Sequence, residues 1–569
     1  MIRTSFVASV LALVVPLGCS SSGDDATSRD DATKKPSPKV CAAVRGNGHY
    51  IMTHFGSLAR VVEHYGVLEG LAGGSSGSIT QFLYESMHMH PDLRKCETGA
   101  CSEEEAAARM SLLLKSVMGY AEVVGGSPEA RSILGLVTAF SEVRTKFDEQ
   151  GIEALASSDA AKAAAEITKI LGSDDIKALV NPEVFTMVTD TAHLEFNVKE
   201  VVASVKTITA FSAVENRIFF RTGVISFADL AEKMGRVADF YAGRATTDTA
   251  GMKKFLDACA KNAVGKQWSA VKELDGDGAK CGAMFTDLVT KFRAELPSKK
   301  GTYSPRVLDK VGDYAPVTKI VSTSVLTGAS VGLYHDALKE YQQGKYPEGN
   351  VPFAPEFKDI KFGYWSSDAV LAKVAANKEG YKDAKTAKFE PLGDATWKEI
   401  IEASPAEPGL SNFVDLPDGK VSAGGWSDLA PVLVLKNAGC DQVVYVTREG
   451  DESTFASGIA KHLGMGETEF ADVFDLDNAS TESKTGSAFA LSIAKSEGVW
   501  CTNWNAFTDF QTVAMFENSY GGPAPDGVPL EGRTSFVREG RFGKPYVNVV
   551  SSSGKIGCTP GLSGHTKLP

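Results

Sequence analysis

One serine stands among glycines at a spacing that suits a nucleophile: positions 73–77 are Gly-Gly-Ser-Ser-Gly, with Ser75 at the centre. A short strand is expected just before this turn, at Gly70–Ala72, and the pattern of Ile79–Met87 predicts a helix after it. A nucleophilic serine on a tight strand-to-helix turn needs flanking glycines, because the backbone is strained and neighbouring elements approach closely. The N-terminus of the helix then stabilises developing negative charge. The alternative is an ordinary Gly/Ser-rich turn.

The segment upstream of this turn supplies a candidate oxyanion hole. Val40–Val44 predicts a strand, positions 46–49 a loop, and Met52–Tyr65 a helix that ends at Gly66. Glycines in such a loop can turn backbone N–H groups toward one point, as the binding of an oxyanion requires. The candidate donors are Gly46, Asn47 and Gly48. Asn47 either adds a side-chain donor or is a residue tolerated at positive φ.

Together these two segments resemble the patatin-like phospholipase family over about forty residues. In that family a strand, a Gly-rich loop and a helix that begins near a Gly-x-Leu sequence precede the serine turn. Here Gly56-Ser57-Leu58 stands at the Gly-x-Leu position, and the interval to Gly73 fits without a gap. The chain departs from the family at Asn47, which replaces a glycine, and at Tyr50 and Ile51, where Arg-Gly usually follows. The resemblance implies a three-layer α/β sheet domain that hydrolyses acyl esters of phospholipids or related lipids, without a metal or organic cofactor.

The second catalytic group of this family is an aspartate in an Asp-Gly-Gly or Asp-Gly-Ala turn, which acts on the serine without a histidine. Positions 423–431 (Ala-Gly-Gly-Trp-Ser-Asp-Leu-Ala-Pro) resemble that turn, and a helix to Asn437 and the strand Val443–Thr447 follow as in the family. However, Ala423 stands at the position of the catalytic aspartate. The base is therefore the weakest part of the resemblance.

Two nearby carboxylates are substitutes for the missing aspartate. Asp428 lies five residues beyond Ala423 and is the candidate base; its alternative role is to cap a helix that begins near Leu429. Asp418 precedes Gly419 at a predicted hairpin tip, where exposure to solvent is expected. If neither carboxylate serves, the chain is a degenerate patatin-like protein that binds lipid or organises the cell envelope without catalysis.

Histidines and other acidic residues support weaker alternatives. His462 follows the last buried strand and would serve a Ser-Asp-His hydrolase, although that fold usually has several strands before its serine turn. His88 and His90 lie at the end of a predicted helix, where we expect surface positions rather than a metal site. Positions 275–278 (Asp-Gly-Asp-Gly) lack the later ligands of a calcium loop and predict a turn.

Residues 1–39 predict export and a lipid anchor. A basic residue and the apolar run Ser5–Leu17 form a signal peptide that is too short to span a membrane as a helix. The run ends in Pro16–Cys19, which resembles a bacterial lipoprotein box with Cys19 as the lipidated residue; the alternative is an ordinary signal peptide. Residues 20–39 lack large apolar side chains and predict a disordered tether. We therefore expect the chain in the bacterial cell envelope, anchored at a membrane surface.

Composition and charge set the wider class. With 569 residues, 43% of them hydrophobic, the chain can bury a large core. A net charge of −12 without a basic block argues against a nucleic-acid partner. The expected organisation is a signal peptide at 1–19, a tether at 20–39, a first part of the sheet domain at 40–101, a helical insertion at 102–345 and a second part of the sheet domain at 346–569.

Within the helical insertion we expect roughly eight amphipathic helices. Their predicted starts are a capping box at Ser102 and Glu105, a cap at Asn181 before Pro182, and a second box at Ser226 and Asp229. The insertion either shapes an acyl-chain site or is a packed helical subdomain. In the C-terminal part, a helix is expected at Ser453–Leu463, a strand at Gly498–Thr502, and turns with short strands over the last fifty residues.

The cysteine content agrees with export. Nine cysteines minus Cys19 leave eight, an even number that suits disulfide bonds in an oxidising compartment. Spacing favours the pairs Cys96–Cys101 and Cys259–Cys281. Cys41, Cys440, Cys501 and Cys558 remain unassigned. Because no Cys-x-x-Cys sequence is present, a zinc or redox site is disfavoured.

Overall fold

A computed structural model provides the structure of the protein. It describes residues 38–46, 51–125, 142–207, 227–244, 248–264, 278–295, 305–310, 321–324, 362–377, 389–393, 395–406, 414–416, 419–421, 424, 431–448, 498–502, 537–539 and 545–547. The fold is mixed α/β, with more helix than strand among these residues. Of the residues described, none belongs to a helix long and apolar enough to cross a membrane.

A seven-stranded sheet, in the order β11-β10-β1-β2-β5-β6-β7, lies at the centre of the described structure. Its strands are β1 Val40–Val44, β2 Gly70–Gly73, β5 Val321–Ser324, β6 Phe362–Trp365, β7 Phe389–Gly393, β10 Gln442–Arg448 and β11 Gly498–Thr502. Neighbouring strands are parallel except β5 and β6, which are antiparallel. Strand β1 consists of apolar residues that are all buried, as is usual for a parallel strand covered on both faces. The strands predicted at Val40–Val44 and Gly498–Thr502 are confirmed.

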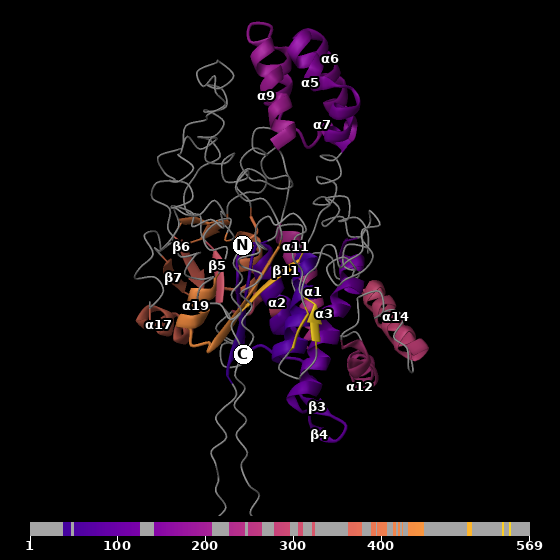
Figure 1. Ribbon diagram of the computed structural model, residues 1–569, viewed down its shortest axis with the longest axis vertical. Helices are drawn as coiled ribbons and strands as arrows, with labels where there is room; N and C mark the ends of the chain where they lie inside the picture. The colour runs from indigo at the N-terminus through magenta and orange to yellow at the C-terminus, as the bar shows by residue number, and fades with distance from the viewer. Residues whose placement is uncertain are drawn as a thin grey trace, which may run out of the picture. The chain divides into compact units, whose positions relative to one another are not determined.

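Helices cover both faces of this sheet. Helix α1 (Ile51–Tyr65) packs on β10 and β11, α2 (Ser76–His88) packs on β2 and β5, and these helices contact each other. Helix α19 (Val432–Asn437) packs on β1, β2 and β10. Helix α19 covers β10 and β2, the strands on which α1 and α2 also pack, but it packs against α17 (Asp368–Asn377) rather than against either of these helices. It therefore occupies the opposite face of the sheet. Figure 1 shows these helices around the strands.

The strand order reverses direction next to β1. The chain proceeds from β1 to β2 and β5 on one side, whereas the later strands β10 and β11 are added on the other side. In parallel α/β sheets, ligands bind beyond the carboxyl ends of the strands at such a switch point. The residues that follow β1 and β2 therefore lie at the edge of the sheet where a site is expected.

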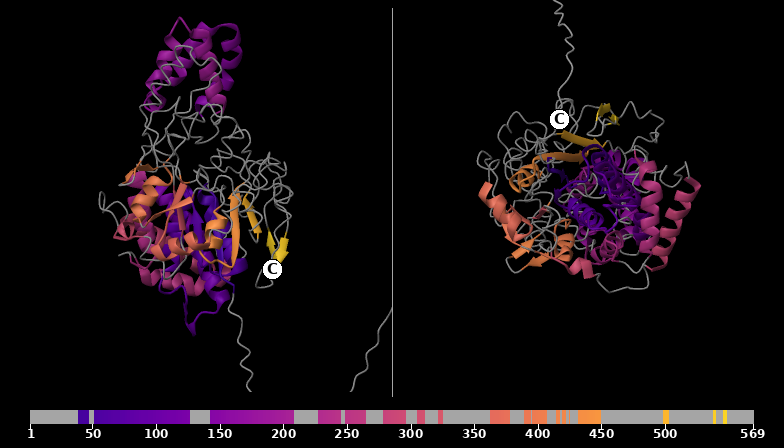
Figure 2. Two further views of the ribbon diagram at one scale, coloured as in Figure 1. Left: turned by 90° about the vertical axis from the view of Figure 1, so that its left-hand side faces the viewer. Right: turned by 90° about the horizontal axis from the view of Figure 1, so that it is seen from below.

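A first group of further helices shares its core with the sheet. They are α3 Glu103–Gly125, α11 Phe227–Tyr241, α12 Thr249–Ala263, α14 Gly278–Glu295, α15 Pro305–Leu308 and α18 Trp397–Ala403. Buried side chains on these helices join those of α1, α2, β1 and β10 in one apolar cluster. Helices α12 and α14 pack on each other and on α3, and the right-hand view of Figure 2 shows α12 and α14, in pink, beside the indigo N-terminal helices.

A second group of helices has a core of its own. Its members are α5 Ile152–Ser158, α6 Ala160–Leu171, α7 Asp174–Lys177, α8 Pro182–Thr189 and α9 Leu194–Thr207. Their buried aliphatic side chains, such as Ile167 and Val198, pack on one another, and Figure 1 shows α5, α6, α7 and α9 gathered in one bundle. The segment expected to be a helical insertion thus divides between two cores.

Several predicted helix starts are confirmed. Ser102 and Glu105 form reciprocal capping contacts of 3.1 and 3.2 Å, α8 begins at Pro182, and α11 begins at Phe227, directly after Ser226. The range 102–345 is not helical throughout, because β5 at Val321–Ser324 pairs with β2 and returns the chain to the central sheet. Its Val-Ser-Thr-Ser sequence is too short for hydrophobic periodicity to predict a strand.

Three disulfide bonds link described residues. Cys96–Cys101 closes the small hairpin of β3 (Lys95–Cys96) and β4 (Gly99–Ala100), and Cys259–Cys281 joins α12 to α14. Cys41–Cys440 joins β1 to Cys440, which lies two residues before β10, across a sequence separation of 399. The two pairs predicted from spacing are confirmed. Two further hairpins are described: β8 (Val414–Leu416) with β9 (Gly419–Val421), and β12 (Val537–Glu539) with β13 (Pro545–Val547).

Candidate functional site

Ser75 occupies a strained turn between β2 and α2. Its φ of 56° and ψ of −129° make it the one non-glycine residue with positive φ in the part of the chain described. Such a conformation costs on the order of 1–3 kcal/mol and persists only where the surrounding structure determines it. Ser75 is also 6% exposed. The predicted strand, turn and helix around this serine are confirmed.

Two glycines of the turn are required by close packing against β1. A Cβ atom on Gly73 would lie 2.8 Å from the carbonyl oxygen of Val44, and one on Gly77 would lie 3.0 Å from the same oxygen. Val44 and Gly73 are also register partners in the sheet. The first turn of α2 therefore rests against the end of β1, which brings Ser75 close to the residues that follow this strand.

The end of β1 begins the candidate oxyanion loop. The Arg45 N–H donates to the Val446 carbonyl at 3.0 Å, which extends the pairing with β10 by one residue. Gly46 follows and is half-buried. A Cβ on Gly77 would be 3.6 Å from the Arg45 carbonyl oxygen, so Gly46 lies one residue beyond a contact with the serine turn. The other two predicted donors, Asn47 and Gly48, lie outside the described residues.

A residue not anticipated from the sequence, Ser404, joins the serine turn to the Gly-Gly segment. Its Oγ accepts a hydrogen bond of 2.8 Å from the Ser75 N–H, and its carbonyl oxygen accepts one of 2.8 Å from the Gly424 N–H. Ser404 and Gly424 are buried. Ser404 thus links the Ser75 turn to the segment that resembles the family's aspartate turn, although the two segments are about 350 positions apart in the sequence.

Helix α18 carries Ser404 to this place. A complete capping box formed by Thr396 and Glu399 begins the helix, and the Trp397 ring packs on Phe82 of α2 with centroids 5.1 Å apart. Ile400 and the rest of the apolar face are buried. Ser404 is the C-terminal cap, so its side chain is set at the end of a short, firmly packed helix.

The candidate base Asp428 lies outside the described residues, as do Ala423 and Gly425. The structure does correct the expected start of the next helix. Helix α19 begins at Val432 with Pro431 at the N-cap position, and no side chain caps it. Proline at this point fixes φ and starts the helix three residues later than predicted. The N-cap residue of α19 is thus Pro431, and the role of Asp428 stays a prediction.

No described residue forms a hydrogen bond with the Ser75 hydroxyl. A buried histidine on the neighbouring helix α1, His54, has its Nδ1 2.8 Å from the Thr80 hydroxyl of α2. Burial lowers the pKa of His54 to about 3, opposed by an interaction with the Arg45 carbonyl. An imidazole with so low a pKa is a poor general base near neutral pH. His462, the alternative base, lies outside the described residues.

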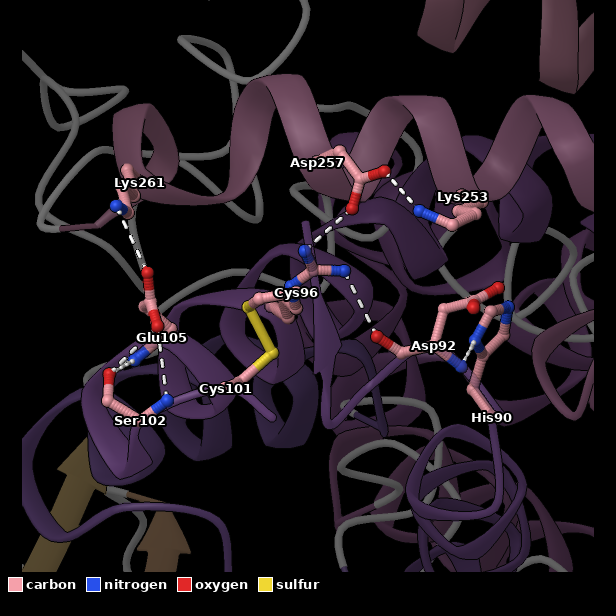
Figure 3. A network of polar contacts seen from close by, with 10 residues as sticks. His90, Asp92, Cys96, Cys101, Ser102, Glu105, Lys253, Asp257 and Lys261 are labelled. Carbon is pink, nitrogen blue, oxygen red and sulfur yellow. Dashed lines mark hydrogen bonds and ion pairs between the residues drawn. A yellow bond between two sulfur atoms is a disulfide. The ribbon is translucent and has the colours of Figure 1, made fainter. Parts of the chain in front are cut away.

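A second polar cluster lies where α3 and α12 meet (Figure 3). Arg109 bonds Asp257 at 2.6 Å and the Asp92 carbonyl at 3.0 Å, while Lys253 reaches the other oxygen of Asp257 at 2.5 Å. Hydrogen bonds and ion pairs hold the pKa of Asp257 below its usual value against the effect of burial. Since its charges are paired with one another, this cluster fastens α12 to α3.

The histidines at the end of α2 belong to the border of this cluster. His90 is buried, and its Nδ1 accepts the Asp92 N–H at 3.1 Å. The surface position predicted for it is wrong, because only 4% of His90 is exposed. Burial lowers the pKa values of both His88 and His90 to about 4. No group of three His, Cys, Asp or Glu side chains in the described residues is placed to hold a metal ion.

A buried ion pair holds α1 and α3 together away from the turn. The Lys115 ammonium lies 2.5 Å from the Glu63 carboxylate and 2.7 Å from the Ala263 carbonyl oxygen. Ser111 donates to the same carboxylate oxygen at 2.5 Å.

Comparison of the chain with protein-family models, curated proteins and solved structures finds no match. The arrangement of its own residues is thus the basis for a functional proposal.

Proposed function

We propose that the chain is a patatin-like serine acyl hydrolase that cleaves the acyl esters of phospholipids or related lipids. The observation that carries this proposal is the strained Ser75 turn, packed against the end of β1 and hydrogen-bonded through Ser404 to the Gly424 segment. Of the residues named, Gly46 and Ser75 follow the parallel strands β1 and β2 at their carboxyl ends, and Gly424 is linked to Ser75 through Ser404. The carboxyl ends of the strands are the edge of an α/β sheet at which sites form.

In the proposed reaction, the Ser75 Oγ attacks the acyl carbonyl carbon while a base takes the hydroxyl proton. Backbone N–H groups of Gly46, Asn47 and Gly48 hold the oxyanion, and the N-terminus of α2 stabilises the same charge. Collapse of this intermediate breaks the ester bond, and the base returns its proton to the departing alcohol. Water then adds to the acyl-serine, which releases the fatty acid and restores the Ser75 hydroxyl.

Asp428 is the proposed base. It lies four residues beyond Gly424, whose N–H is held by Ser404, and the helix it was expected to cap begins farther on, at Val432. The alternative function rests on Ala423, which stands where the family has its aspartate. In that case the chain is a degenerate relative that binds lipid without cleaving it. In either case Cys19 anchors the chain to a membrane surface.

A fluorophosphonate probe tests the proposal, because it reacts only with an activated serine. We expect the full chain to be labelled at Ser75, the Ser75→Ala variant to be unlabelled, and phospholipid in mixed micelles to be hydrolysed only by the former. Asp428→Asn should lower both rates by about 10²–10⁴-fold, the usual contribution of a general base. Asp418→Asn is the matched control and should change neither rate.

Absence of labelling in the wild-type chain would contradict the enzyme proposal and support the degenerate alternative. That alternative makes a positive prediction of its own: Asp428→Asn changes little, and Ala423→Asp raises a feeble activity. A Ser-Asp-His hydrolase would be identified instead if wild type is labelled, a His462 variant is not labelled, and an Asp428 variant still is. Mass spectrometry of the mature N-terminus tests the anchor, since an unmodified residue beyond Cys19 would exclude it.

A further inference from the structure

The backbone of Ser75 is held on both sides of its strained conformation. Its carbonyl oxygen accepts bonds from the Ser78 N–H at 2.9 Å and the Ser78 hydroxyl at 2.6 Å, both within the first turn of α2. Its N–H is held by a different part of the chain, the Ser404 hydroxyl. A positive φ in a side-chain-bearing residue needs such constraints from outside the local sequence.

Ser404 is well placed to provide a constraint that does not move. It is 0% exposed, so its hydroxyl has no competing contact with bulk solvent. Packing of Trp397 on Phe82 fixes α18 to the same helix that Ser75 begins. The backbone carbonyl of Ser404 meanwhile holds the Gly424 N–H. One residue thus fixes the nucleophile turn through its side chain and the neighbouring Gly-Gly turn through its backbone.

We propose that Ser404 is a positioning residue, whose hydroxyl keeps Ser75 in the conformation from which its Oγ attacks. This inference rests on the proposed hydrolase function but assigns a role to a residue outside the family's motifs. Ser404 does not contact the reacting atoms. Its effect is on the geometry of the attack, and misplacement of a reacting group by about 1 Å can lower a rate by about 10²-fold.

Substitution of the side chain separates these two contacts. Ser404→Ala deletes the hydroxyl that binds Ser75 but keeps the carbonyl that binds Gly424. We expect kcat and the probe reaction rate to fall by about 10–10²-fold with KM nearly unchanged, because ground-state binding does not depend on the turn. Ser86→Ala is the matched control: Ser86 is also 0% exposed, and its hydroxyl bonds the Phe82 carbonyl within α2 at 2.6 Å. Its kcat should stay within about twofold of wild type.

A second pair of variants holds the shape constant. Thr and Val have nearly the same volume and differ in the hydroxyl, so Ser404→Thr should retain kcat and Ser404→Val should lose it. This comparison also decides the matter if Ser404→Ala does not fold. Rates are taken on folded protein, as judged by circular dichroism and thermal unfolding.

The outcomes distinguish this inference from the proposed function. If wild type is not labelled at Ser75, the hydrolase proposal is refuted, and so is the role of Ser404, which rests on it. If wild type is labelled but Ser404→Ala matches Ser86→Ala, or Thr and Val react equally fast, the hydrolase proposal stands and the role of Ser404 is refuted. A rise in KM at constant kcat would likewise overturn it, since that pattern belongs to substrate binding.

Discussion

Substitution of Gly73 by alanine should damage both stability and activity, through a contact that the structure makes explicit. The new Cβ would lie 2.8 Å from the Val44 carbonyl oxygen and 3.1 Å from the Gly77 Cα. Both neighbours are backbone atoms, and Val44 is paired with Gly73 in the sheet, so no side-chain rotation relieves the overlap. Overpacking of this kind costs about 1–3 kcal/mol, and two backbone contacts place Gly73→Ala near the upper value.

Relief of the overlap requires α2 to move away from β1, which carries Ser75 away from Gly46. We therefore expect the fluorophosphonate rate to fall by about 10²-fold in the molecules that remain folded. The matched control is Gly439→Ala: Gly439 has a φ of 95° but open space around its Cβ position. That variant carries conformational strain alone, about 1–2 kcal/mol, and should react with the probe as wild type does.

Urea unfolding gives the free energies of unfolding of Gly73→Ala and Gly439→Ala, and labelling at urea concentrations below the unfolding transition gives their rates of reaction with the fluorophosphonate probe. The reasoning is refuted if Gly73→Ala is no less stable than Gly439→Ala and reacts at the wild-type rate. A stable but unreactive Gly73→Ala would show that β1 and α2 separate easily, so that the contact serves the geometry of the site rather than the fold.

Three further predictions follow from other parts of the structure. Lys115→Met leaves the Glu63 carboxylate buried without its ammonium and should lower the free energy of unfolding by about 3–5 kcal/mol, while the double variant with Glu63→Leu should recover most of this loss in urea titrations. Burial depresses the pKa of His54 from 6.5 to about 3, so its contribution to stability is complete above pH 6.5 and declines as pH falls toward 3, by about 1.4 kcal/mol per pH unit. The free energy of unfolding of His54→Gln should therefore decline less steeply than that of wild type between pH 6.5 and pH 4. Peptide mapping without reduction should recover the Cys41–Cys440 crosslink, and its loss in Cys41→Ala with Cys440→Ala should lower the free energy of unfolding by about 2–4 kcal/mol; absence of that crosslink in wild type would contradict the β1–β10 pairing.

The first part of the sheet was predictable because its signals are local. Val40–Val44 is an unbroken apolar run, Gly66 ends the following helix with a φ of 93°, and the glycines of the serine turn mark a close approach. Each signal lies within a few residues of the element it specifies. Predictions over this segment therefore agree with the structure to within three residues, the largest difference being the start of α2 at Ser76 rather than Ile79.

What the sequence could not predict depends on residues far apart. Ser404 meets Ser75 across 329 positions, and Cys41 meets Cys440 across 399. No spacing rule connects such pairs, and Ser404 itself follows a helix like many others. A short strand such as β5 was missed for a related reason, since it is recognised as a strand only when β2 lies beside it.

The pairing of β1 with β10 also has a consequence for the time course of folding. Strand β2 follows β1 within thirty residues and can pair with it early, but the other edge of β1 pairs only after β10, Gln442–Arg448, has been synthesised. At ribosomal rates of about 5–20 residues per second, the intervening chain takes roughly 20–80 s to emerge. During that interval one edge of β1 presents unpaired N–H and C=O groups, a template for pairing with another chain. The length of chain between β2 and β10 therefore sets how long each nascent molecule is exposed to aggregation.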